Sequence, residues 1–440
     1  MKHILFVLLF FYTLSSSVIS QTREELLEYF EEAQYFFNRG DFEDAVYFFL
    51  KLVEADSLNA NYNFKLGESY LNIPGKEHKA IPYFETSLRN VVPKKSYKKR
   101  SIDETAAPLH VYFYLGNAYR MNNRLDKALE SYMKFIDSPF FYGNYNQNVV
   151  DREIKSCERA KIIQDAPLAY EKINLGIAIN SDFYEEKPVV SGDGNTLVFI
   201  RRLKFYDAIF FSVKVNNEWQ TAQNINPQIL SDGEYYPTGL SSDGRSLLLI
   251  KKEEDSHDVY ISFFDGTVWS KAERLGNRIN SLFNEIHAGF GADDHILYIT
   301  SNRKGGKGGY DIYSSRQNAN GEWSKPKNLG RQINTEFDER DACYCTDQNV
   351  LFFSSQGHYT MGGYDIFYSK KIEKKWQIPL NLGYPINNTR DNLFYSPVKD
   401  NCREGYYSMV EEDGLGEADL YLIQITSKNT LNFSESGTDE

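Results

Sequence analysis

The sequence lacks an excess of basic residues and, after its first twenty residues, it lacks any long apolar run. Lys and Arg number 49 against 61 Asp and Glu, which gives a formal net charge of −12. Proteins that bind nucleic acid need a basic face, so nucleic-acid binding is excluded as the main activity. A bilayer span needs about 20 consecutive apolar residues, and no stretch beyond residue 20 supplies them.

The first twenty residues have the pattern of a secretory signal peptide. Lys2 and His3 precede the apolar run Ile4–Tyr12, and the small residue Ser20 fits a cleavage site before Gln21. The apolar core is too short for a comfortable membrane span, so cleavage is favoured over an uncleaved anchor. No Cys follows the predicted cleavage site, so an acyl-anchored lipoprotein is not expected. The sequence therefore predicts export.

Residues 166–426 carry a repeat of 50 to 54 residues. The four tryptophans occupy one position of it, namely Trp219, Trp269, Trp323 and Trp376. An Asp before an apolar or aromatic pair recurs in step at Asp207, Asp258, Asp311, Asp365 and Asp419, and an Ile marks each start at Ile179, Ile229, Ile279, Ile333 and Ile386. Periods of this size indicate an array of supersecondary units, and five units of four short strands predict a five-bladed β-propeller.

The fifth repeat stops before its fourth strand. Residues 170–176 resemble a fourth strand and precede the first repeat, so we expect them to pair beside residues 419–423 and close the ring. The Trp series is interpreted as packing between blades rather than as a ligand platform. The Asp series and the glycine-rich stretch Gly305–Gly309 are interpreted as turn and cap residues, because no helix or Lys-Ser/Thr follows the glycines.

The four cysteines are Cys157, Cys343, Cys345 and Cys402. Cys343 and Cys345 are two residues apart on one predicted strand, which suits neither a mutual bridge nor a Cys-x-x-Cys site. Thiols that serve as packing groups are the favoured interpretation. A bridge between Cys345 and Cys402 across neighbouring blades is the alternative, since export permits disulfides.

Residues 21–165 switch to a helical period. Ala33, Gly67 and Gly116 align as small residues, each followed three residues later by an aromatic residue. Leu66-Gly67-x-x-Tyr70 and Leu115-Gly116-x-x-Tyr119 resemble the tetratricopeptide repeat. The resemblance implies stacked helical hairpins with a groove that takes a peptide segment. The alternative is that the groove packs against the protein's own propeller.

The candidate partner-binding residues fall in two groups. The groove group is Phe30, Phe37, Asn61, Phe64, Phe113, Asn117 and Arg120. The second group is a basic insertion between repeats, made of Lys94, Lys95, Lys98, Lys99 and Arg100. This insertion is either a solvated loop, which is modestly favoured, or a docking patch for an acidic partner or anionic surface.

A third candidate is a ring of acidic residues at the start of the inner strands: Glu185, Glu234, Glu285 and Glu339, with His287 two residues after Glu285. Because inner strands line a propeller's central channel, these groups would hold a cation or a basic partner group there. The favoured alternative is that each Glu accepts backbone N–H bonds from its neighbouring blade. Repetition in every blade argues against a unique catalytic pair, so no enzyme activity, cofactor or metal is expected.

The turn at Ser191–Gly194 and the strands at Gly308–Tyr313 and Gly362–Phe367 resemble TolB-like, or WD40-like, propeller repeats. Helical repeats followed by such a propeller, behind a signal peptide, resemble PorE-like periplasmic proteins of the type IX secretion system. The resemblance covers nearly the whole chain. That family continues into an OmpA-like peptidoglycan-binding domain, whereas this sequence ends in the short polar segment 427–440, so peptidoglycan anchoring is not carried over.

The resemblance implies a non-catalytic scaffold in the periplasm or at the outer membrane. Its partners would be envelope proteins of a secretion or gliding-motility complex, and any outer-membrane association would run through them. Two other classes of function remain open. One is a carbohydrate- or peptide-binding propeller for nutrient capture, and the other is a hydrolase.

Overall fold

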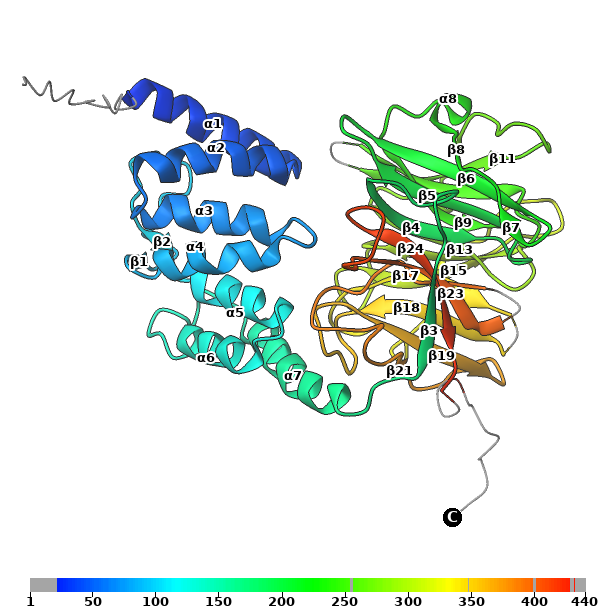
Figure 1. Ribbon diagram of the computed structural model, residues 1–440. Helices are drawn as coiled ribbons and strands as arrows, with labels where there is room; N and C mark the ends of the chain where they lie inside the picture. Colours follow the sequence, from blue (N-terminus) through cyan, green and yellow to red (C-terminus); the bar gives the residue numbers. More distant parts are fainter. Residues whose placement is uncertain (1–21, 254–255, 347, 399–400, 428–430, 432–440) are drawn as a thin grey trace, which may run out of the picture. The chain divides into compact units, whose positions relative to one another are not determined.

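The computed structural model describes residues 22–253, 256–346, 348–398, 401–427 and 431 (Figure 1). The predicted signal peptide, residues 1–20, and most of the polar segment 427–440 lie outside this range. The chain divides into two compact units, one of residues up to 118 with 138–140, the other of residues 119–137 with 141–440. Among the described helices, none combines the length and apolar character that crossing a bilayer requires.

The first unit is built of helical hairpins. Its helices are α1 (Arg23–Arg39), α2 (Phe42–Ala55), α3 (Ala60–Leu71), the 3₁₀ turn η1 (Glu77–Lys79), α4 (Ala80–Ser87) and most of α5 (Val111–Met121). A capping box between Thr22 and Glu25 starts α1, and Gly40, at φ 86°, ends it in the left-handed conformation.

The small residues of the repeat lie where the helices meet. Ala33 and Ala45 are fully buried, and a Cβ added to Gly67 would come within 2.7 Å of the Phe84 ring. The predicted tetratricopeptide-like packing of α3 against α4 is therefore confirmed at the residue that the sequence pattern selected.

The second unit contains α6 (Leu125–Ile136), α7 (Gln147–Gln164) and five sheets. Blade 1 is β4 (Tyr184–Val190), β5 (Thr196–Arg202), β6 (Asp207–Val215), β7 (Glu218–Trp219) and β8 (Gln223–Asn224), followed by the short helix α8 (Asn226–Ile229). Blade 2 is β9 (Tyr235–Leu240), β10 (Ser246–Lys252), β11 (His257–Phe263) and β12 (Glu273–Arg274). Blade 3 is β13 (Glu285–Phe290), β14 (Ile296–Ser301), β15 (Asp311–Arg316) and β16 (Lys327–Asn328).

Blade 4 is β17 (Glu339–Cys345), β18 (Val350–Ser355), β19 (Asp365–Ile372), β20 (Lys375–Trp376) and β21 (Leu380–Asn381). Blade 5 is β22 (Ser396–Val398), β23 (Asn401–Met409), β24 (Asp419–Ile425) and β3 (Tyr170–Asn174). The N-terminal strand β3 pairs antiparallel with β24, from Tyr170 opposite Ile425 to Asn174 opposite Tyr421. The dark green β3 beside the red C-terminal strands in Figure 1 is thus the predicted closing strand.

A buried asparagine joins each blade to the one before it. Asn280 accepts a hydrogen bond from the Val259 backbone N–H at 2.7 Å and donates to the Val259 carbonyl at 3.0 Å. The equivalent residues are Asn180, Asn226, Asn334 and Asn387, which bond the third strand of the preceding blade in the same way. In the second repeat the start is therefore Ile225-Asn226, and Ile229, which the sequence pattern selected, lies one helical turn later.

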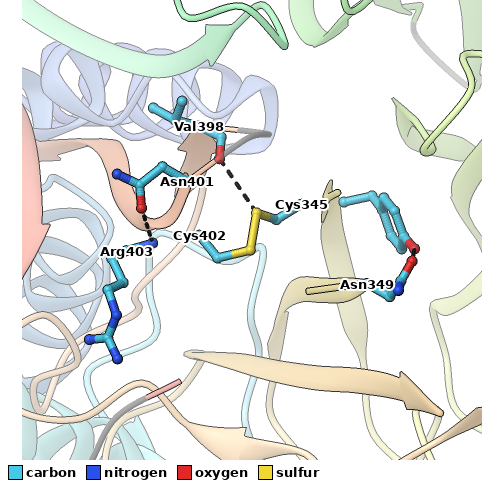
Figure 2. The surroundings of a disulfide bond; sticks show 7 residues. Cys345, Asn349, Val398, Asn401, Cys402 and Arg403 are labelled. Atoms are coloured by element: carbon cyan, nitrogen blue, oxygen red, sulfur yellow. Dashed lines mark hydrogen bonds between the residues drawn. A yellow bond between two sulfur atoms is a disulfide. The ribbon is translucent and has the colours of Figure 1, made fainter. Parts of the chain in front are cut away.

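Cys345 of β17 and Cys402 of β23 form a disulfide between blades 4 and 5 (Figure 2). Their Cα atoms are 5.7 Å apart, inside the range that a disulfide requires. The favoured interpretation of these two cysteines as packing thiols was wrong, and the alternative bridge is present. Cys157 is buried on α7, where burial raises the pKa of its thiol to about 12.

Three Asp residues that start the third strands, Asp311, Asp365 and Asp419, act as local caps, as predicted, whereas Asp258 binds Arg274 instead. Asp365 accepts hydrogen bonds from the backbone N–H groups of Met361 and Gly362, and Asp419 accepts them from Leu415 and Gly416. These carboxylates hold the preceding turns in place, so they are committed to the fold.

Candidate functional site

The basic loop, residues 93–100, is an ordered excursion between α4 and α5. Its ends are held together by a parallel ladder of two residue pairs between β1 (Val91–Val92) and β2 (Ala107–Pro108). Glu104 then fastens the loop, because its carboxylate accepts hydrogen bonds from the backbone N–H groups of Lys98 and Ala106 at 2.8 and 2.9 Å. All five cationic residues of the loop are exposed.

Tyr97 connects this loop to two of the predicted groove residues. Its hydroxyl donates a 2.7 Å hydrogen bond to Asn61 Oδ1, and its ring lies edge-on to Phe64 at 6.2 Å between centroids. Phe64 also contacts His110 and Tyr114 at 5.5 and 6.0 Å. The Tyr97 contact therefore brings the basic loop beside two of the predicted groove residues, which the sequence offered as a separate candidate.

A buried ion pair lies in the same groove, one helical turn after Asn61. Lys65 is 1% exposed, and its Nζ is 3.1 Å from Glu68 Oε2. The ammonium also lies 5.4 Å from the Phe37 ring centroid and 5.6 Å from that of Phe64, within range of a cation–π attraction. Burial raises the pKa of Glu68, and the Lys65 charge opposes that shift.

Two buried amide nitrogens of the groove have no hydrogen-bond partner among the described residues, namely Asn61 Nδ2 and Gln34 Nε2. A buried donor without an acceptor costs about 1–3 kcal/mol. Burial also lowers the pKa of His110 to about 4, so its imidazole is neutral at physiological pH. Asn61 Nδ2 and Gln34 Nε2 are thus donors that an acceptor group could satisfy.

The structure distributes the predicted groove residues unevenly. Phe30, Asn61 and Phe64 are buried, whereas Phe37, Phe113 and Asn117 are partly exposed. Lys65 and Tyr97 are the site residues that sequence reasoning missed. The available signals were the spacing of Lys65 four residues after Asn61, which puts both on one helix face, and the single aromatic residue within the basic loop.

Arg120 belongs to the second unit and is not a groove residue. It is 4% exposed, its Nε lies 3.0 Å from Glu153 Oε2 of α7, and its Nη1 donates to the Thr389 carbonyl in the segment that joins blades 4 and 5. Helix α7 also bonds blade 4 through Ser156, whose Oγ is 2.8 Å from Thr360 Oγ1. The prediction of Arg120 as a partner-binding residue is therefore corrected, because an arginine buried in these intramolecular contacts cannot bind a partner.

The acidic residues of the inner strands do not form a ring. Glu185, Glu285 and Glu339 are fully buried, and each is bonded within its own repeat. Glu285 accepts hydrogen bonds from Ser281, Ser301 and Arg303, so its partners are not the backbone of a neighbouring blade either. Glu234 differs, since its side chain is 49% exposed and its carboxylate lies 3.8 Å from Lys251 Nζ.

The residues two positions later occupy the channel instead. Lys187, His287, Asp341 and Phe394 line one cavity of about 10 Å³, which holds at most about one water molecule. Lys187 lines this cavity, and its ammonium lies 4.7 Å from the Tyr236 ring centroid and 5.1 Å from that of Phe394. Burial lowers the pKa of His287 to about 4. The cavity has room for neither a substrate nor, with a cation already inside, an added basic group.

Glu339 differs from Glu285 because, among the described residues, no arginine donates a hydrogen bond to its carboxylate. Arg303 follows Ser301 by two residues, whereas the matching position after Ser355 is Gly357, where an added Cβ would lie 1.9 Å from Thr335 Oγ1. Burial without a cation raises the pKa of Glu339 to about 7. Below about pH 4.5 this carboxyl is protonated in both the folded and unfolded chain, and as the pH rises to 7 the unfolded chain ionises first, so stability falls.

We expect Glu339→Gln to remove this fall in folding stability with rising pH. At pH 8 the variant should be more stable than the natural protein by up to about 3 kcal/mol, and near pH 4 the two should be equal. Denaturant unfolding at both pH values measures the difference. Glu285→Gln is the matched control and should destabilise at pH 8, because it removes the 2.9 Å ion pair with Arg303. A less stable Glu339→Gln at pH 8 would show that the pKa of Glu339 is not raised by folding.

No family model and no curated protein matches the sequence. Among solved structures, TolB from Acinetobacter baumannii matches at 16% identity over 56% of this chain and 56% of its own, with a TM-score of 0.37. A putative TolB from Agrobacterium tumefaciens matches at 13% identity over 59% of this chain and 99% of its own, with a TM-score of 0.34. The first TPR of Spaghetti (RPAP3), bound to an HSP90 peptide, matches at 16% identity over 32% of this chain and 97% of its own, with a TM-score of 0.24.

The chain spans about half the length of the TolB from Acinetobacter baumannii. GH62 glycoside hydrolases are also among the matched structures, at 12% and 11% identity. The strand order and helix pairs define the class, a helical-repeat protein joined to a five-bladed β-propeller. Its solved neighbours include TolB-like propellers and a tetratricopeptide-repeat domain.

Proposed function

We propose that this protein is a non-catalytic interaction scaffold, and that its helical groove takes an acidic segment of a partner protein. The observation that supports the proposal is the Tyr97 contact, because it joins a loop with five exposed cations to Asn61, whose Nδ2 has no partner among the described residues. A carboxylate could accept from Asn61 Nδ2 and Gln34 Nε2. The loop charges would attract such a segment to a protein whose overall charge is −12.

Two further observations support a scaffold over an enzyme. The channel cavity of about 10 Å³ is filled by Lys187 and aromatic rings. The carboxylates that the sequence singled out are used in hydrogen bonds within their blades.

The resemblance to PorE-like proteins supplies the cellular setting of the proposal. The protein would be exported to the periplasm, where it would join envelope proteins of a secretion or gliding-motility complex and reach the outer membrane through them. The signal-peptide pattern of residues 1–20 supports export.

Charge reversal of the basic loop tests the proposal. Changing Lys94, Lys95, Lys98, Lys99 and Arg100 to Glu should weaken capture of an envelope partner at least about tenfold, and the natural protein's capture should fall with added salt. The matched control changes five exposed propeller cations to Glu, which alters the net charge equally: Lys325, Lys327, Arg331, Lys374 and Lys375. Quantitative pull-down from envelope extract measures both. Equal loss in the two variants would reduce the effect to net charge and contradict the proposal.

A second variant tests the role of Tyr97. Tyr97→Ala removes the cover over Asn61 and Phe64, so a synthetic Glu-rich peptide should bind the variant more tightly than the natural protein, by about tenfold if the covered state is dominant. Fluorescence anisotropy with the labelled peptide gives both affinities. Unchanged or weaker binding would mean that the groove is not the peptide site.

A further inference from the structure

A groove of about 620 Å³ lies between blades 2 and 3. Its apolar part is formed by Ile261 and Phe263 of β11, Phe290 of β13 and Trp323. The remainder of its lining is made of charged and amide side chains together with Leu275, Ile279, two serines and two glycines. The volume falls in the range of ordinary ligand sites, and no residue of the groove takes part in the helical site described above.

At the seam between blades 2 and 3, the positions that face the tryptophan are aliphatic rather than aromatic. Each of the other three tryptophans lies against a ring of the preceding blade. These pairs are Trp219 with Tyr406 at 6.0 Å, Trp269 with Phe211 at 5.4 Å and Trp376 with Tyr298 at 6.3 Å. Opposite Trp323 the preceding blade offers Leu248 and Ile261, which are paired across β10 and β11. At the other three tryptophans an aromatic ring fills this space, and here two aliphatic side chains leave it open. The Trp323 ring therefore borders the groove.

Two backbone positions beside the groove, Phe263 and Arg316, are already paired. The Phe263 N–H donates to Ser270 Oγ at 3.0 Å, and the Phe263 carbonyl accepts from the Ser270 N–H at 2.8 Å. On the other side, the Arg316 N–H donates to Ser324 Oγ at 3.0 Å, and its carbonyl accepts from the Ser324 N–H at 2.9 Å. At these two positions no backbone group is left for a peptide strand to bond.

The polar groups of the groove are of both signs. Glu273, Arg278 and Glu322 are exposed, and within the described part of the chain Glu273 and Arg278 make no side-chain hydrogen bond. Arg274 is already engaged, since it donates to both carboxylate oxygens of Asp258 at 2.7 and 3.1 Å. Donors and acceptors stand side by side with nearly balanced charge, which suits hydroxyl groups because each hydroxyl both donates and accepts.

We propose that this groove binds a neutral, linear oligosaccharide. The apolar C–H face of one sugar ring would lie on the Trp323 indole, where aromatic surface and weak C–H contacts favour it. The sugar hydroxyls would then bond Arg278 as a donor and Glu273 as an acceptor. Because the groove is open between two blades, a chain of several sugars would lie along it.

The test uses the full chain and isothermal titration calorimetry with cellohexaose, xylohexaose, mannohexaose and maltohexaose. At least one of them should bind with a Kd at or below about 1 mM. Trp323→Ala should weaken that binding at least about tenfold. Ile261→Phe, which places a ring where blade 1 has Phe211, should also weaken that binding at least about tenfold while keeping the fold.

Trp376→Ala is the matched control, since it removes the same side chain from the neighbouring seam, and its affinity should stay within about twofold of the natural value. Three results would overturn the proposal. One is no binding of any neutral hexaose at millimolar concentration, and the second is full binding by Ile261→Phe. The third is tighter binding of hexagalacturonate, which would indicate a site for an acidic ligand.

Discussion

Removing the closing strand should abolish cooperative folding of the propeller. A fragment of residues 179–440 lacks β3, so β24 would expose the hydrogen-bonding groups that pair with Tyr170 through Asn174. It would also lose the 2.7 Å bond from Asn174 Nδ2 to Asp419. An exposed edge of this kind promotes aggregation, and the loss should approach the whole folding stability, about 5–15 kcal/mol for a typical domain.

The matched control is the fragment 166–440, which also lacks α7 but keeps β3. It should remain monomeric in size-exclusion chromatography and unfold in one transition. If both fragments aggregate, the contacts of α7 with blade 4 are essential and β3 is not the deciding element. If 179–440 folds as well as 166–440, closure by β3 contributes little.

Removing the disulfide should have the second largest effect. Cys345 and Cys402 are 57 residues apart in sequence, and a cross-link over a loop of this length stabilises by about 4 kcal/mol in the chain-entropy model. The double variant Cys345→Ala/Cys402→Ala should therefore unfold at clearly lower denaturant concentration than the oxidised natural protein. Repeating both measurements in a thiol reductant provides the control, because the difference should then nearly vanish. Equal stability under oxidising conditions would contradict the bridge.

The repeat period predicted the blade count and the closing strand because Trp and Asp recur at positions where every blade needs the same packing and the same cap. The period could not predict which way the inner-strand side chains point. In blades 1 and 4 the strand register shifts just after Glu185 and Glu339, and Lys187 and Asp341 adopt φ values of 51° and 56°. Each irregularity turns the glutamate into its own blade and leaves the residue two positions later in the channel.

The helical site shows a different limit of sequence reasoning. The tetratricopeptide pattern located Asn61 and Phe64 on the groove face, and the charge run located the basic loop. Their meeting depends on a tertiary contact, the Tyr97 hydroxyl bond to Asn61, which no local period encodes. Arg120 was misplaced for the same reason, because its partners Glu153 and Thr389 are distant in sequence.

The position of β3 has a consequence for the timing of folding. During synthesis β3 leaves the ribosome about 250 residues before β24, its partner in the sheet. At roughly 5–20 residues per second, that delay is on the order of ten to fifty seconds. Throughout this interval the propeller can build blades 1 to 4 in order but cannot close. The first propeller strand therefore stays unpaired until synthesis is nearly finished.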